Sequence, residues 1–369
     1  MFKRILKIFI AAINIIALAV IFVSSPVIQA EASAENALHG KIVILDAGHG
    51  LGSSNIYAGY DEQVTMLKLA NKIKRNLESY GITVYMTRPA QYNVHLSVRA
   101  AAINIWALQE VKKVRPNDAG EIDRLIKIMQ NIIDDYEKYA PVYMNYPFDY
   151  AFKRKIHTDL QKVFEYQDHP VIRDKFLVIS LHSDATAQPI DTSINGATAF
   201  HISNNFKYNP RGSYYGNYSN EDRSRKFGNK LLDNIDKLGI RKREVRHSAL
   251  FILREHNLPA VLIENGFHTN DHDRDKLSDD AFLDRLALVY ADTISAYFTE
   301  ISPLPEYQML ETPEQQHIAT PFSIYRRPSF ASEKITTYSP QTVIIRARTA
   351  DGWALISTSH GRYWVYIGN

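Results

Sequence analysis

Four short segments of this 369-residue chain carry histidine and carboxylate side chains in settings that suit hydrolytic chemistry. They contain His49 in Asp-Ala-Gly-His-Gly, Glu62, His182 in Ser-Leu-His, and Glu264 in Ile-Glu-Asn-Gly. Two imidazoles and one carboxylate can bind zinc and leave a fourth position open for water. A further carboxylate beside that water can accept its proton and pass it to a leaving nitrogen. These residue types therefore favour metal-assisted hydrolysis of an amide.

The elements that would position these side chains alternate along the chain. Apolar runs predict strands and amphipathic patterns predict helices, the first of them with Asp61 as its N-cap. The predicted strands cover residues 41–46, 82–86, 176–181, 197–201 and 260–263, and the predicted helices cover 61–80, 221–238 and 280–298. This alternation predicts an α/β fold with a mixed, mostly parallel sheet flanked by helices on both faces.

The candidate residues follow this pattern closely. His49, His182 and Glu264 stand after or at the end of predicted strands, and Glu62 stands in the first turn of a predicted helix. The carboxyl ends of strands in an open α/β sheet share one edge, and sites form there. We therefore expect the four side chains to converge although they are far apart in sequence.

The residues around His49 suggest how its ring is aimed. Gly48 and Gly50 would let the backbone turn tightly, so that the ring faces a metal. Asp46 is placed to accept a hydrogen bond that orients a ligand.

The chain has no His-Glu-x-x-His sequence, so the helical zinc-protease motif is absent. His268 follows Glu264 by four residues, but Gly266 between them favours a turn over a helix. We therefore expect His268 to lie at the surface.

Composition and charge exclude several classes of function. The net charge of +3 equals the contribution of Lys3, Arg4 and Lys7, so the rest of the chain is neutral. A neutral body argues against nucleic acid as a partner. Because the chain has no cysteine, a disulfide scaffold and a Cys-ligated zinc site are excluded, and any metal must bind His, Asp or Glu.

Residues 1–34 have the pattern of a signal peptide. Three basic residues precede an apolar stretch at 8–23, and Ala32-Ser33-Ala34 forms a cleavage site of small residues. The alternative is a retained N-terminal anchor, although the stretch is slightly shorter than the roughly 20 residues of a comfortable membrane span. Either reading places the body outside the cytoplasm, secreted or associated with the cell wall, with membrane contact only if the segment is retained.

Three further parts of the chain depart from the alternating pattern. Residues 105–175 carry two helical patterns, at about 120–139 and 150–166, and form a helical insertion that is either a hairpin packed on the sheet or a lid or docking arm. Residues 301–320 contain three prolines and little periodicity, which predicts a linker. Residues 321–369 alternate in short runs between turns, which predicts a small all-β barrel.

Together the chemical segments resemble the zinc-dependent N-acetylmuramoyl-L-alanine amidases of bacterial cell-wall turnover. The resemblance covers roughly residues 41–300 and keeps the order of the family's motifs. These motifs are Asp46–Gly50, Glu62, Thr87-Arg88, Leu96–Arg99 with Asn104, Ser180–His182 and Pro259–Asn270.

This resemblance implies a catalytic domain at 41–300 in which His49, Glu62 and His182 bind one Zn²⁺ per chain and Glu264 is the catalytic carboxylate. It implies hydrolysis of the amide between N-acetylmuramic acid and L-alanine in peptidoglycan. The sequence has Ala47 where the family often has proline, which should be harmless because proline would only stiffen the turn. The stretch 105–175 is longer than in compact members, so the resemblance implies no role for it.

The tail, 321–369, resembles bacterial Src-homology-3-like wall-binding modules through Tyr338–Val343, Asp351–Trp353 and Gly361–Val365. This implies that the tail binds the cell wall, and Trp353 and Trp364 either fill its core or contact a ligand.

Two other functions remain open at this stage. The chain could be a catalytically inactive wall-binding or scaffold protein, or a zinc amide hydrolase acting on another peptide substrate. The first would predict loss of a metal ligand or of the terminal carboxylate, whereas all four residues are present.

Overall fold

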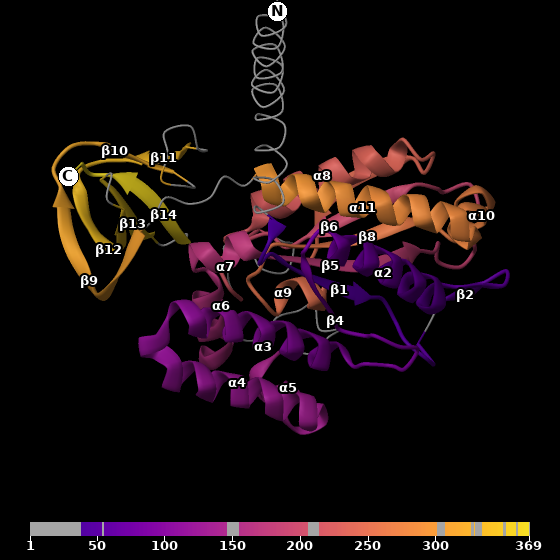
Figure 1. Ribbon diagram of the computed structural model, residues 1–369, viewed down its shortest axis with the longest axis horizontal. Coiled ribbons are helices and arrows are strands. Elements are labelled where there is room, and N and C mark those ends of the chain that lie inside the picture. The colour runs from indigo at the N-terminus through magenta and orange to yellow at the C-terminus, as the bar shows by residue number, and fades with distance from the viewer. Residues whose placement is uncertain are drawn as a thin grey trace, which may run out of the picture.

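The computed structural model contains two separate six-stranded sheets (Figure 1). It describes residues 38–53, 55–145, 155–205, 214–300, 307–325, 328, 334–349, 352–358 and 361–368. The predicted signal peptide or anchor at 1–34 lies outside the described residues. Within the described part of the chain, no helix combines the length and the apolar character needed to cross a bilayer.

The first sheet has the strand order β4-β1-β5-β8-β6-β7. Its strands are β1 (Ile42–Ala47), β4 (Thr83–Met86), β5 (Phe176–Asp184), β6 (Ala197–His201), β7 (Lys242–His247) and β8 (Ala260–Phe267). All neighbours pair in parallel except β6 and β8. The predicted mixed, mostly parallel sheet is therefore confirmed. Strand β7 was not predicted, because its sequence is mostly charged and contains no apolar run.

Helices cover both faces of this sheet, as predicted. One face is covered by α2 (Glu62–Ser79), α8 (Glu221–Asp236), α10 (Asp271–Ser278) and α11 (Asp280–Glu300). The other is covered by α3 (Leu96–Val114), α4 (Ala119–Asp134), α5 (Tyr136–Tyr143), α6 (Thr158–Gln167), α7 (Pro170–Lys175) and α9 (Phe251–Arg254). Successive strand residues point to opposite faces, so Val43 and Leu45 belong to the first core and Ile42 and Ile44 to the second.

The start of α2 shows how the sequence fixes a helix at the site. Asp61 is extended, and its carboxylate accepts hydrogen bonds from the backbone N–H groups of Gln63 and Val64, as an N-cap does. Met66, Leu69 and Ile73 are buried on one side of the helix. This capping sets Glu62 as the first helical residue, facing the sheet edge.

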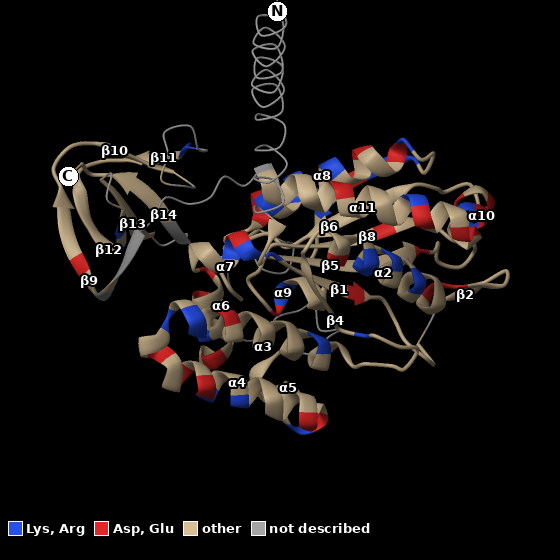
Figure 2. Cartoon of the chain, viewed as in Figure 1, with Lys and Arg blue, Asp and Glu red and all other residues tan. Residues whose placement is uncertain are grey.

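The predicted helical insertion at 105–175 is helical in its described residues, with different boundaries. Helix α3 begins at Leu96, before the predicted start, and the predicted helix at 120–139 is divided at Asp135. Asp135 has φ −152° and caps α5 by accepting from Lys138 N. Residues 146–154 lie outside the described part. Figure 2 shows acidic and basic residues mixed on α4 and α5.

This stretch shares the core of the sheet. Leu125 of α4 and Phe164 of α6 are fully buried in the same cluster as Ile44 and Val178 of the strands. The helices therefore pack on one face of the sheet and supply much of its apolar cover.

The second sheet lies in the C-terminal part and is antiparallel, in the order β11-β10-β14-β13-β12-β9. Its strands are β9 (Tyr307–Ile318), β10 (Phe322–Tyr325), β11 (Lys334–Tyr338), β12 (Gln341–Thr349), β13 (Trp353–Thr358) and β14 (Gly361–Tyr366). Among the described residues no pairing joins β9 to β11, so closure into a barrel stays a prediction. Trp353 and Trp364 are 4% and 2% exposed, in agreement with a core role.

The predicted linker at 301–320 is wrong for most of its length, because residues 307–318 form β9. This strand pairs with β12 at the edge of the sheet, and the register shifts near Pro313. Proline is tolerated at edges and bulges, so the prolines did not mark a linker there.

Candidate metal centre

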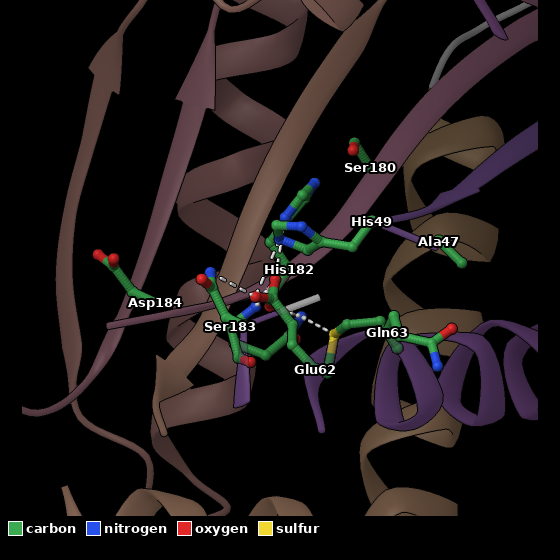
Figure 3. Close-up of polar contacts among 12 residues, drawn as sticks. Ala47, His49, Glu62, Gln63, Ser180, His182, Ser183 and Asp184 are labelled. Atoms are coloured by element: carbon green, nitrogen blue, oxygen red, sulfur yellow. Dashed lines mark hydrogen bonds and ion pairs between the residues drawn. The ribbon is translucent and has the colours of Figure 1, made fainter. Parts of the chain in front are cut away.

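Three of the predicted residues meet at the carboxyl edge of the first sheet. Potential ligand atoms of His49, Glu62 and His182 all lie within 4.8 Å of one another. Glu62 Oε2 is 2.9 Å from His49 Nε2, and Glu62 Oε1 is 3.0 Å from His182 Nδ1 (Figure 3). His49 follows β1, His182 lies in β5, and Glu62 is the first residue of α2. The sequence predicted this convergence from the strand ends.

Glu62 is the centre of the cluster and is fully buried. It also accepts hydrogen bonds from Asn55 Nδ2, at 2.9 Å, and from Ser183 N, at 3.0 Å. Burial alone would raise the pKa of Glu62, but hydrogen bonds to His182 and His49 outweigh it and hold the pKa far below its ordinary value. Glu62 is therefore an anion at neutral pH.

This donor set fits zinc. Zinc takes imidazole nitrogen and carboxylate oxygen at about 2.0–2.2 Å, so ligands of a tetrahedral site are separated by about 3.3 Å. The observed separations of 2.9 and 3.0 Å between Glu62 and the two rings are close to that spacing. Three protein donors also leave a position for water or substrate.

Glu264 lies beside this cluster on β8, in register with His182. Its Oε2 is buried and has no hydrogen-bond partner among the described residues. Burial raises the pKa of Glu264, and the negative charges of Glu62 and Asp184 raise it further. A bound cation would act in the opposite direction. Figure 3 shows Asp184 to the side of the cluster, with its carboxylate turned away from His49.

The glycines beside His49 provide room for the neighbouring chain. His49 itself has the left-handed φ of 59°, whereas the sequence suggested that the glycines make the turn. A Cβ on Gly48 would lie 2.5 Å from His182 Cε1, and a Cβ on Gly50 would lie 2.7 Å from Asn93 Cα. Both contacts are too short for any side chain, so glycine is required by close approach.

Two buried guanidinium groups hold the loop that carries His49. Arg99, in the first turn of α3, donates to the carboxylate of Asp46 at 3.0 Å, to Ala47 O at 2.9 Å and to His49 O. Arg88 donates to Ala47 O at 3.1 Å and to the next carbonyl at 2.9 Å. Successive carbonyls of this turn are thus fixed by the Thr-Arg and Leu-x-x-Arg motifs of the sequence.

The sequence suggested that Asp46 orients a metal ligand directly. In the structure Asp46 instead acts through this hydrogen-bond network. It accepts hydrogen bonds from Ser180 Oγ at 2.6 Å, from Thr87 Oγ1 and from Arg99. Burial would raise the pKa of Asp46, but the charge of Arg99 and the two hydroxyl bonds keep it below its ordinary value. The ring of His49 is instead held at Nδ1, 2.6 Å from the backbone carbonyl of Ser53.

His268 is buried, so its predicted place at the surface is wrong. It is 1% exposed, its Nδ1 lies 3.0 Å from Ser183 Oγ, and its ring stacks on Tyr60 at 5.1 Å. Strand β8 continues through Phe267, so His268 directly follows its end and lies beside Ser183 of β5. No local pattern in the sequence predicts this row of Tyr60, His268 and Ser183, because its members come from three separate segments.

A cavity of about 540 Å³ opens beside His49 and His182. Its far wall is formed by α9, and His95, the N-cap of α3, forms another side. The ring of His95 stacks on Tyr136 of α5, with centroids 4.1 Å apart. Helix α5 thus contacts a residue of the cavity wall, which the sequence did not reveal.

The fold and the site define a class of hydrolase, and comparison with known proteins identifies the family. A sequence profile of the N-acetylmuramoyl-L-alanine amidases matches residues 43–110 and 126–296, and the chain belongs to this family. A comparison with curated proteins finds no match.

Several solved structures are similar. The catalytic domain of CwlV, an N-acetylmuramoyl-L-alanine amidase from Bacillus (Paenibacillus) polymyxa var. colistinus, is 19% identical with a TM-score of 0.42, covering 70% of this chain and 98% of that one. An N-acetylmuramoyl-L-alanine amidase from Clostridium difficile 630 is 15% identical with a TM-score of 0.44, covering 71% and 98%. Ami1 from Mycobacterium smegmatis is also 15% identical with a TM-score of 0.44, covering 71% and 99%. At these low scores, the family assignment rests on the profile.

Proposed function

We propose that this chain is a zinc-dependent peptidoglycan hydrolase that cleaves the amide bond between N-acetylmuramic acid and L-alanine. Membership of the amidase family supports the reaction and the cell-wall substrate. The observation that carries the proposal is the meeting of His49, Glu62 and His182 within 4.8 Å. Beside them lies Glu264, whose Oε2 has no hydrogen-bond partner among the residues described.

In this proposal His49, Glu62 and His182 hold one Zn²⁺ per chain. The metal would polarise the scissile carbonyl and lower the pKa of a water molecule. Glu264 Oε2 has no competing partner in the part of the chain that the structure describes, so it can accept the proton of the attacking water and give it to the leaving nitrogen of L-alanine. Arg99 and Asp46 keep the His49 loop in place through their hydrogen bonds.

Digestion of purified peptidoglycan by the full chain tests this function. We expect new N-terminal L-alanine and intact glycan strands, together with about one zinc per chain. Release of other ends would indicate an amide hydrolase with a different substrate, and binding without cleavage would indicate an inactive wall-binding protein. A metal-free chain with full activity would exclude the zinc mechanism.

We also propose that the C-terminal sheet is a Src-homology-3-like domain that binds the cell wall, and that the protein acts outside the cytoplasm. The signal-like residues 1–34 and the typical place of cell-wall amidases support the location. A domain that binds the wall raises the local substrate concentration without new chemistry. Deleting residues 307–369 should therefore slow cleavage of intact walls more than cleavage of soluble muropeptides, and equal slowing would contradict a wall-binding role.

A further inference from the structure

A row of three side chains crosses the first sheet from the cavity to its edge strand, β7. Leu262 of β8 lines the cavity and pairs in register with Phe200 of β6, which pairs in register with Arg246 of β7. Residues opposite each other in register project from the same face of a sheet. The Cζ atom of Arg246 lies 4.7 Å from the centre of the Phe200 ring. The guanidinium therefore folds back over the sheet, toward the cavity.

The guanidinium of Arg246 is accessible to a ligand. Its side chain is 55% exposed, and its ion pair at 3.0 Å is with Glu244, whose side chain is 52% exposed. An ion pair between such exposed groups contributes little, so an incoming carboxylate can displace Glu244 at small cost. Arg243 is also exposed, with its Cζ 5.1 Å from the ring centre of Phe267, and it adds a second positive charge.

Both arginines belong to β7, which lies two places from β8 in the sheet. Neighbouring strands are about 4.8 Å apart, and β6 alone separates β7 from β8, which carries Glu264. The distance from β8 to β7 is therefore about 10 Å, and an extended peptide covers it in about three residues.

We propose that Arg246, assisted by Arg243, binds a free carboxylate on the peptide stem of peptidoglycan, on the leaving-group side of the cleaved amide. This inference rests on the proposed function, because it assumes that the amide is cut beside Glu264. The stem carries carboxylates within a few residues of L-alanine, and a guanidinium can pair with a carboxylate through two hydrogen bonds.

A purely protective role for the arginines makes a different prediction. Charged side chains on an edge strand prevent the strand from pairing with another molecule. Such a role is independent of any charge on the substrate. The two readings are therefore separated by substrates that differ in a single carboxylate.

The test uses the full chain and two soluble muramoyl peptides whose second stem residue is either D-glutamate or its carboxamide. We expect Arg246→Gln to raise the KM for the carboxylate substrate about three- to tenfold, with kcat unchanged and the KM for the carboxamide substrate unchanged. Arg285→Gln is the matched control, since Arg285 is exposed on α11, with its Cζ 5.6 Å from the ring centre of Phe282. It should change neither KM.

An equal change in KM for both substrates, or no change for either, would overturn the inference. If the wild-type chain cleaves neither substrate, the proposed function fails and binding decides the inference separately. Calorimetry with the dipeptides L-Ala-D-Glu and L-Ala-D-isoglutamine would then show tighter binding of the first, and Arg246→Gln would remove the difference. Equal binding of the two dipeptides by the wild-type chain would overturn it.

Discussion

The His49 loop and the helices α3 to α6 are held in the fold by opposite means. The loop is fixed by Arg88 and Arg99, whose guanidinium groups donate to its carbonyls. The helices are fixed by apolar side chains such as Leu160 and Phe164, which share a core with the strands. Directed hydrogen bonds set the position of individual atoms, whereas apolar burial is non-directional and sets the position of whole elements.

The two regions are joined at the start of α3. Arg99 belongs to this helix but contacts the loop, and its guanidinium also bonds Asp46. The apolar core therefore positions the helix, and the helix delivers the charged group that positions the loop. A change in the loop network should therefore alter catalysis as well as stability, whereas a change in the core should alter stability with little effect on catalysis.

The largest effect on activity is expected at the cluster that both regions support. Glu264→Gln should lower kcat at least about 100-fold while zinc stays bound, because the residue is assigned to proton transfer. His182→Ala should lose zinc and activity together. Activity assays with zinc analysis of both variants check this, and loss of zinc from Glu264→Gln would show that its role is ligation.

A smaller but still large loss is expected when the loop is released. Arg99→Met removes the donor to Ala47 and His49 and leaves the Asp46 carboxylate buried with fewer partners. Activity should fall at least about tenfold, and zinc affinity should fall about 10- to 100-fold, because groups that orient a metal ligand contribute on that scale. Titration with a zinc chelator measures this. Unchanged affinity would mean that the loop keeps its shape without Arg99.

Asp46 links the loop to pH. Its pKa is lower in the folded chain than in the unfolded chain, so its ionisation stabilises the fold above the ordinary pKa of an aspartate. That contribution is lost as the pH falls through the lowered pKa. Asp46→Asn should therefore destabilise the chain at neutral pH. It should also make the free energy of unfolding less dependent on pH in the acidic range. Unfolding curves at several pH values check this, and parallel curves for variant and wild type would contradict it.

The smallest effect on activity is expected in the apolar core. Phe164→Ala should lower the free energy of unfolding by about 3–5 kcal/mol, because it opens a cavity under the helices. Below the unfolding temperature, kcat should stay within about twofold of the wild-type value, since this side chain touches neither the cluster nor the loop. A large fall in kcat for still-folded protein would show that the helices control the site more directly than their packing suggests.

The sequence predicted the parts of this molecule that are encoded by local pattern. Apolar runs located five strands of the first sheet. The ends of predicted strands located His49, His182 and Glu264, and the first turn of a predicted helix located Glu62. Strand β7 was missed because an edge strand needs no apolar run.

Contacts between distant segments could not be predicted in the same way. The stack of His95 on Tyr136 and the row that buries His268 depend on packing between elements, which has no signature within any one of them. The room required beside Gly48 is likewise a property of the neighbouring strand.

The order of the donors along the chain has a consequence for the timing of assembly. His49 and Glu62 follow β1 and begin α2, which are close in sequence, whereas His182 joins them only when β5 pairs with β1. Closing so long a stretch of chain is slow compared with local structure. Two donors bind a metal ion more weakly than three. Tight metal binding would therefore require that β5 has already paired with β1. Under the proposed function, binding of the metal is therefore a late event in folding.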